Sequence, residues 1–397
     1  MLTFLELADA GVPRAFLRVG GTTVARQQVA LALDLGCERI VCIAPGMRPE
    51  IIELQHLAEA RGAQFHVVAG ARALLGLVTS SDELLVLGDG LFASAGLATD
   101  LLGQGQAVLV QPIEQGLAAG FERIDLTTAS ASAMRVPGRL VDGLGELPPD
   151  CDAASSLQRL ALQSGVRQRS LPGVDGGQQF WSLVRSDAEA QSLEPQWIRQ
   201  RTSDDRPLYP SRFLALAFVR GLGPSLLHAG SGATHLAIGA AMMAAIAVAA
   251  GWLGFFATGL IFCAVGWLCR EIAALLARVE TGLLQGRHQV LAQVGSYGWM
   301  VDAIIIGLVG WGSTTLPLQD LPYRFFPAFM LVALMRIIPG LSQARWTAWL
   351  GDRAALALGL AAALGAGVGT IAVHAGAVAA ALAGILVPRL TKRLTRP

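Results

Sequence analysis

The sequence predicts two parts of different fold class, an α/β doubly wound domain followed by an all-α transmembrane domain with six spans. Short β-rich runs alternate with helical stretches up to about residue 150. Residues 221–269 then carry no formal charge at all. The chain of 397 residues is 53% hydrophobic and only 15% charged, which is too apolar for an ordinary soluble protein.

The first predicted domain covers residues 1–150. The stretches between its β-rich runs, TTVARQQVALALDLG and MRPEIIELQHLAEARG, carry apolar residues at helical spacing. This alternation predicts a mostly parallel sheet, in which ligands bind at the carboxyl ends of the strands. The predicted buried strands are RIVCIA (39–44), QFHVVA (64–69), ELLVLGDG (83–90) and QAVLVQ (106–111).

Residues 151–205 are predicted to be one further helix followed by a charged, partly helical connector. The membrane domain is then 206–397, beginning with an amphipathic interfacial helix at 210–222. Because the uncharged stretch after it is too long for a single span, it is divided at the GWLG turn. The six predicted spans are about 233–251, 254–275, 295–315, 323–341, 353–372 and 374–391.

Basic residues predict the orientation of these spans. The loops between them that carry Arg278, Arg287, Arg345 and Arg353 fall on one side, together with the basic C-terminal tail. By the positive-inside rule this side is cytoplasmic, which predicts a multi-pass protein of the inner membrane with its N-terminal domain and C-terminus in the cytoplasm. The start of the chain lacks the pattern of a signal peptide, and no nucleic-acid-binding motif is present.

Asp302 is the first candidate functional residue, because an acid inside an apolar span is costly and usually has a ligand or a partner. Glu271 and Glu280 lie near the same predicted cytoplasmic end. Together such carboxylates could hold a divalent cation against a nucleotide diphosphate. The alternative is structural, with Glu271 paired to a neighbouring arginine and Asp302 hydrogen-bonded inside the bundle.

Residues 206–391 resemble the CDP-alcohol phosphotransferase family, whose signature is D-x2-D-G-x2-A-R followed by G-x3-D-x3-D. Gly298 and Asp302 match the second half, but Ile306 stands where the family has its catalytic base. In the first half neither aspartate is present, whereas Glu280, Gly282 and Arg287 lie near the expected places. The resemblance implies a homodimer and a pocket for CDP-alcohol, Mg²⁺ or Mn²⁺ and a membrane lipid, with release of CMP.

The first domain resembles the sugar-phosphate nucleotidyltransferases. VPRAFLRVGGTTVARQQ is similar to their P-K-x-L-x-x-V-x-G-x-P-L segment, which places Arg14, Gly20 and Gly21 as nucleotide-binding candidates. LLVLGDGLF is similar to their metal-binding strand end, with Asp89 as the tentative ligand of Mg²⁺ or Mn²⁺, or else a plain turn residue. Asp125 is a further candidate for this site, a surface salt bridge being the alternative.

The order of the two domains resembles bifunctional enzymes of di-myo-inositol phosphate synthesis, in which one domain makes the CDP-alcohol that the other consumes. Two hypotheses follow. The protein is a divergent CDP-alcohol phosphotransferase of phospholipid or polar-head-group biosynthesis, or it is a non-catalytic relative that binds nucleotide or lipid or scaffolds a partner enzyme. The missing aspartates favour the second hypothesis, since one aspartate cannot hold two cations.

Overall fold

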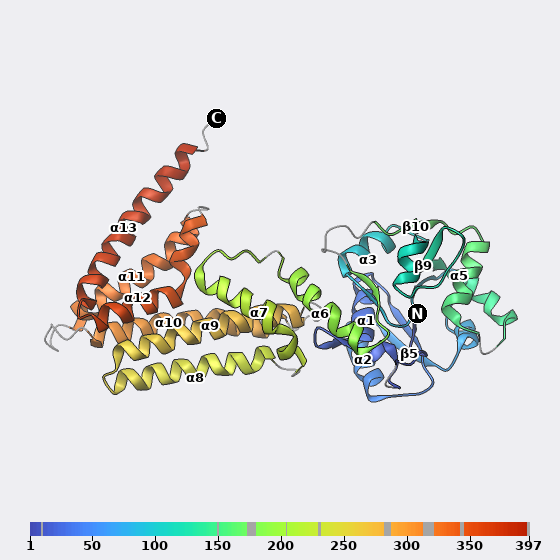
Figure 1. Cartoon of the computed structure of the whole chain (residues 1–397), viewed down its shortest axis with the longest axis horizontal. Helices are drawn as coiled ribbons and strands as arrows, with labels where there is room; N and C mark the ends of the chain where they lie inside the picture. The colour runs from blue at the N-terminus through green and yellow to red at the C-terminus, as the bar shows by residue number, and fades with distance from the viewer. Residues whose placement is uncertain are drawn as a thin grey trace. The chain divides into compact units, whose positions relative to one another are not determined.

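The computed structural model of the chain divides into two compact units, Met1–Gln200 and Arg201–Pro397. The division lies close to residue 206, the predicted start of the membrane domain. All the β-strands belong to the first unit, and the second unit is helical over the part of it that is described (Figure 1). The structure describes residues 1–8, 11–148, 151–172, 180–203, 205–228, 232–281, 287–312, 321–341 and 345–394.

A seven-stranded mixed sheet forms the centre of the first unit. Six of its strands form two groups, and the strands within each group pair in parallel. The strand β9 lies between the two groups and is antiparallel to its neighbour on either side. The strand order is β10 (Gln168–Ser170), β8 (Ala107–Pro112), β9 (Thr128–Pro137), β6 (Glu83–Leu87), β1 (Leu2–Thr3), β4 (Arg39–Ile43) and β5 (Gln64–Val68).

Both faces of this sheet are buried, as the predicted doubly wound arrangement requires. In β6, Leu85 and Leu87 belong to one hydrophobic core, whereas Leu84 and Val86 belong to another. The first core includes residues of α1 (Val24–Asp34), α2 (Pro49–Ala60) and α3 (Ala95–Leu102). The second includes residues of the 3-10 helices η2 (Ala71–Gly76) and η3 (Gly138–Glu146) and of α5 (Ala153–Gln163).

The four predicted strands are confirmed as β4, β5, β6 and β8, and the helices around them as α1, α2 and α5. No sequence pattern predicted β1 or the antiparallel β9. A strand of two residues has too few positions to show a period, and β9 consists mainly of alanine and serine, which have weak strand propensity. The remaining short helices of this sheet region are η1 (Arg14–Phe16) and α4 (Ile113–Ala118).

Two small antiparallel pairs complete the first unit. The hairpin of β2 (Arg18–Val19) and β3 (Thr22–Thr23) precedes α1, and β7 (Leu91–Ala93) pairs with β11 (Trp181–Leu183). The connector after β11 forms α6 (Asp187–Arg201), which confirms the helix predicted in it.

The second unit begins with α7 (Pro210–His228), which is longer than the predicted interfacial helix. The predicted turn after the first span is confirmed, because α8 ends at Trp252 and Gly254 adopts a φ of +84° before α9 begins. Helices α8, α9 and α10 pack against one another (Figure 1). The elements are α8 (Gly232–Trp252), α9 (Phe256–Thr281), α10 (Arg287–Gly312), α11 (Leu321–Leu341), the 3-10 helix η5 (Arg345–Gly351), α12 (Arg353–Gly365) and α13 (Gly369–Leu394).

Four stretches of described helix are long and apolar enough to cross a membrane, namely Gly232–Trp252, Phe256–Val279, Tyr323–Gly340 and Gly369–Leu386. Two shorter apolar stretches are Ser296–Gly312 and Arg353–Gly365. The number six stays a prediction. One predicted boundary is wrong, since the span drawn over 353–372 is interrupted: α12 ends at Gly365 and Gly367 turns the chain with a φ of +74°.

Candidate functional site

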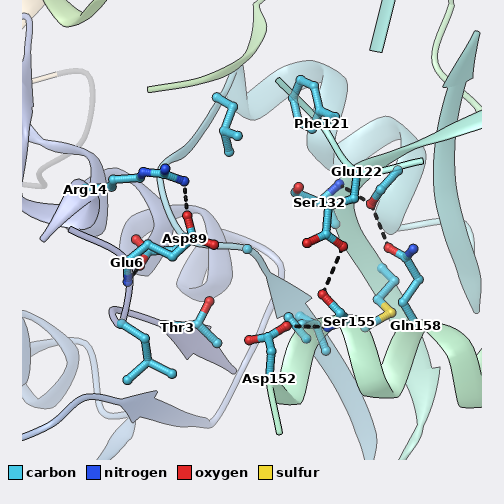
Figure 2. A pocket seen from close by; sticks show the side chains of 18 of the residues that line it. Thr3, Glu6, Arg14, Asp89, Phe121, Glu122, Ser132, Asp152, Ser155 and Gln158 are labelled. Carbon is cyan, nitrogen blue, oxygen red and sulfur yellow. Dashed lines mark hydrogen bonds and ion pairs between the residues drawn. The ribbon is translucent and has the colours of Figure 1, made fainter. Parts of the chain in front are cut away.

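A cavity of about 140 Å³ opens beside the carboxyl ends of β1 and β6, where the sheet topology places ligand sites. Its volume accommodates several water molecules. Arg14 and Asp89 both line it, so the structure brings together two of the residues predicted for nucleotide and metal binding (Figure 2). The other polar side chains that line it are Thr3, Glu6, Glu122, Ser130, Ser132, Asp152, Ser155 and Gln158.

Asp89 is positioned by the tight turn that ends β6. The Gly88 amide donates a 2.7 Å hydrogen bond to the Ser132 carbonyl of β9, which fixes the start of the turn. Gly90 has a φ of +72°, and a Cβ there would lie 2.5 Å from the Val184 carbonyl oxygen. Glycine is therefore required immediately after Asp89, which explains the GDG sequence in structural terms.

The Asp89 carboxylate is buried, with only 9% of the residue exposed. Its Oδ2 accepts a 2.7 Å hydrogen bond from the Glu6 amide, whereas its Oδ1 is buried without a hydrogen-bond partner among the described residues. Burial raises the pKa of the Asp89 carboxyl to about 7, although backbone hydrogen bonds and the charge of Arg14 act in the opposite direction. The carboxyl is therefore partly protonated at neutral pH, and a bound cation would favour its charged form.

Arg14 lies in η1 and forms an ion pair with Glu6. Its Nη1 donates to Glu6, and its Nε is buried without a partner among the described residues. Guanidinium groups bind phosphate oxygens well, so Arg14 can supply the anion-binding element of the cavity. Sequence reasoning missed Glu6, because the strand β1 that precedes it is too short to recognise.

The opposite wall of the cavity comes from β9, α5 and the segment before β9 (Figure 2). Asp152 caps α5 by accepting a 2.7 Å hydrogen bond from the Ser155 amide, and the Ser155 hydroxyl donates to Glu122 at 3.0 Å. Ser132 has a φ of +54°, an unusual conformation for a residue other than glycine. Only the folding of these segments onto one another brings this wall together, which is why no sequence pattern predicted it.

Three other residues predicted for this site do not line the cavity. Gly20 and Gly21 form the turn of the β2–β3 hairpin, where φ values of +64° and +82° favour glycine. Gly20 also lies against α6, because a Cβ there would be 2.5 Å from Nε1 of Trp197. The exposed Asp125 closes a local turn, accepting hydrogen bonds from Thr127 and Thr128 that lower its pKa to about 2.

In the second unit, Asp302 on α10 is buried and its carboxylate is held by two arginines. Arg353 Nε donates to Oδ1 at 2.6 Å and its Nη2 to Oδ2 at 3.2 Å, while Arg336 Nη1 donates to Oδ2 at 2.5 Å. Arg336 in turn stacks on Trp299, 3.5 Å from the ring centroid. The predicted role as a metal ligand does not fit this arrangement, because a cation would have to displace a guanidinium from an oxygen already in use.

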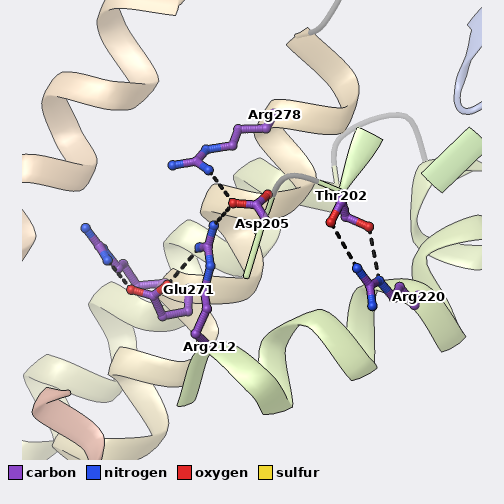
Figure 3. A network of polar contacts seen from close by, with 7 residues as sticks. Thr202, Asp205, Arg212, Arg220, Glu271 and Arg278 are labelled. Atoms are coloured by element: carbon purple, nitrogen blue, oxygen red, sulfur yellow. Dashed lines mark hydrogen bonds and ion pairs between the residues drawn. The ribbon is translucent and has the colours of Figure 1, made fainter. Parts of the chain in front are cut away.

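Glu271 on α9 is in a similar position, with 1% of the residue exposed (Figure 3). Arg212 of α7 donates to it at 3.0 Å, and Arg270 pairs with its other oxygen. Arg212 also bonds Asp205 at 2.5 Å, and Arg278 reaches the same Asp205 oxygen at 2.8 Å. This is the structural alternative considered for Glu271, extended to a network that ties α7 to α9.

Gly298 lies one turn before Asp302 on α10, and a Cβ there would be 3.7 Å from Nη2 of Arg336. The side chains of Glu280 and Arg287, the other two predicted pocket residues, lie outside what the structure describes. Among the described residues there is no group of three or more His, Cys, Asp or Glu side chains that could hold a metal ion by itself.

No protein-family model matches the chain, and no curated protein does. Among solved structures, it is similar to the UDP-glucose pyrophosphorylase from Acinetobacter baumanii, at 13% sequence identity and a TM-score of 0.37. The match covers 50% of this chain and 92% of that one. Because a likeness of this degree assigns no family, the function has to be inferred from the geometry of the site.

Proposed function

We propose that this chain is a membrane-bound, nucleotidyltransferase-like protein of polar-head-group biosynthesis that binds a CTP-type nucleotide in its N-terminal unit. The observation that carries the proposal is the buried, unpartnered Oδ1 of Asp89 in a cavity that also holds Arg14. A carboxylate with an oxygen to spare next to a guanidinium suits a phosphate accompanied by a cation.

A divalent cation fits this site as a partner of the nucleotide. Mg²⁺ is commonly bound through one or two carboxylates together with the phosphates of the substrate, so a single protein carboxylate is sufficient. Asp89 would hold Mg²⁺ or Mn²⁺ through Oδ1, and Arg14 would bind a phosphate oxygen. The cation would neutralise the phosphates next to the acidic side chains.

For the membrane unit we propose a non-catalytic relative of the CDP-alcohol phosphotransferases, which binds lipid or the CDP-alcohol without transferring it. Both buried acids predicted for that chemistry, Glu271 and Asp302, are neutralised by arginines. A carboxylate held in this way is a poor metal ligand and a poor general base. Residence in the inner membrane and homodimer formation remain parts of this proposal.

Transfer of a phosphoalcohol from a CDP-alcohol is the second candidate function. It is favoured by the burial of Glu271 and Asp302, at 1% and 4% exposure, on the consecutive helices α9 and α10. Buried acids in an apolar helical unit often belong to functional sites. In this case the arginines would have to move to the phosphates of the substrate.

The test uses the purified full chain in lipid nanodiscs. CTP with Mg²⁺ should raise the melting temperature and bind in calorimetry, and Asp89→Asn should weaken this binding at least about tenfold, through loss of a charged interaction. Radiolabelled CDP-alcohols should release no CMP. Mg²⁺-dependent CMP release that Asp302→Asn abolishes would establish the second candidate, and absence of CTP binding would overturn the first.

A further inference from the structure

We infer that the cavity beside Asp89 also accepts the phosphate ester of an amino alcohol, with its ammonium group against the wall formed by Phe121, Glu122 and Asp152. The inference rests on the proposed function, since it concerns the second ligand of the same cavity. A nucleotide-binding protein of head-group synthesis has to recognise an alcohol phosphate as well. The charges of the cavity indicate which chemical class of alcohol phosphate it binds.

The charge of the cavity is unbalanced. Of the described residues that line it, Glu6, Asp89, Glu122 and Asp152 are acids and Arg14 is the one base. Arg14 is paired with Glu6 on one side, so Glu122 and Asp152 stand on the other side without a cation near them in the lining (Figure 2). A ligand that spans the cavity is therefore complementary when it is anionic at Arg14 and cationic at the opposite wall.

One buried group indicates a ligand in this space. Asp89 is more than nine-tenths buried and lines the cavity with an oxygen that no described group satisfies. Buried polar atoms of this kind are rare and usually meet a ligand, an ion or water. Phe121 lies in the lining next to Glu122, but it is only 3% exposed and belongs to the hydrophobic core, so the carboxylates have to supply the recognition of the ammonium group.

The stretch of β9 in the cavity lining is held in a fixed shape. Trp181 Nε1 donates to the Ala131 carbonyl at 2.8 Å, and Gln111 Nε2 donates to the Ser130 carbonyl at 2.9 Å. The Ser130 hydroxyl donates to Gln158 at 2.6 Å and accepts from the Ser132 amide at 3.0 Å. These bonds hold the irregular stretch of β9, so a ligand would meet a wall that needs little rearrangement.

An amino-alcohol phosphate fits these charges better than a polyol phosphate. The two carboxylates are exposed to solvent and already accept hydrogen bonds from Ser155. Hydroxyl groups can donate to them as well, but they do not neutralise their negative charges. An ammonium group compensates them, and hydrogen bonds to charged groups contribute more than neutral ones. The cavity is therefore expected to bind the probes phosphocholine or phosphoethanolamine more tightly than glycerol phosphate and inositol phosphate.

The experiment is calorimetry on the full chain in nanodiscs with phosphocholine, phosphoethanolamine, glycerol 3-phosphate and inositol 1-phosphate. At least one amino-alcohol phosphate should bind about tenfold more tightly than the two polyol phosphates, as one charged contact implies. Glu122→Gln should reduce that binding to the polyol level and leave the polyol phosphates unchanged. The matched control is Glu114→Gln, an exposed acid of α4 outside the cavity lining, which should change nothing.

Equal or tighter binding of the polyol phosphates would overturn the inference, and so would a loss of all four ligands in Glu122→Gln. Titration with CTP and Mg²⁺ on the same preparation separates this failure from failure of the proposed function. If CTP binds and depends on Asp89 while no amino-alcohol preference appears, the inference is wrong and the nucleotide proposal stands. If the preference appears without CTP binding, the nucleotide proposal is wrong and the amino-alcohol site stands.

Discussion

The buried acids of the two units differ in which groups neutralise the charge of their carboxylates. Asp302 and Glu271, in the membrane unit, have both carboxylate oxygens bonded to arginines of the same chain. Asp89, in the first unit, has one oxygen on a backbone amide and the other without a partner among the described residues. Burial alone therefore does not identify a ligand site. An acid is available to a ligand only where the protein has left its charge or its lone pairs unused.

The largest effect is expected from breaking the ion pairs of Asp302. Asp302→Ala leaves Arg353 and Arg336 without their carboxylate inside an apolar unit, and removal of one partner of a buried pair costs about 3–5 kcal/mol. The variant should melt far below the wild type in nanodiscs. Changing Asp302 to Leu together with Arg353→Met and Arg336→Met should recover much of the loss, because no buried charge is then unpaired. If Asp302→Ala melts like the wild type, the structural role is wrong.

The pH dependence of Asp89 should be opposite to that of a paired acid. Its pKa is about 7 in the fold and 3.8 as a reference, so the folded protein keeps a proton that the unfolded chain releases as the pH rises between these values. The free energy of unfolding thus decreases from about pH 4 to pH 7. Asp89→Asn, which stays neutral, should be more stable than wild type at pH 8 by about 2–4 kcal/mol and nearly equal to it at pH 4.

Chemical denaturation at pH 8 and pH 4 measures this difference. A wild type whose stability relative to Asp89→Asn is the same at both values would contradict the raised pKa. The same ionisation should make the affinity for CTP with Mg²⁺ increase as the pH passes through 7, because the cation needs the charged carboxylate.

Gly20 tests whether the β2–β3 turn is structural or part of the ligand site. Gly20→Ala introduces a Cβ at a positive φ and at 2.5 Å from Trp197, which should cost about 1–3 kcal/mol of stability. Gly36→Ala is the matched control, since Gly36 has a φ of +81° but no atom within 4 Å of its Cβ position. The difference in melting temperature between the two variants isolates the contact with Trp197. A change in the CTP dissociation constant in Gly20→Ala alone would restore a ligand role.

The smallest effect is expected from Arg14→Lys. The charge is kept, but a lysine cannot offer the planar pair of donors that matches phosphate oxygens. CTP should bind about three- to tenfold more weakly, or about 1 kcal/mol, with little change in melting temperature. Unchanged CTP binding in calorimetry would show that Arg14 serves only as the partner of Glu6.

The two-part architecture could be predicted from the amino-acid sequence alone. Hydrophobic periodicity and the loss of charge after residue 221 are local properties, and they predicted β4, β5, β6 and β8 and the helical second unit. Asp89 and Arg14 could also be predicted, because each lies beside an element that its own segment defines. Such features can be predicted from the local sequence pattern, because they do not depend on which segments pack against them.

The compensation of the buried acids, in contrast, became visible from the folded chain. Arg353 is separated from Asp302 by 51 positions and Arg212 from Glu271 by 59, and no local pattern relates them. The wall of Glu122, Asp152 and Ser132 likewise exists only because β9 and α5 meet at the end of β6. Electrostatic compensation depends on distances of a few ångströms between remote segments, and the order of residues along a chain does not contain those distances.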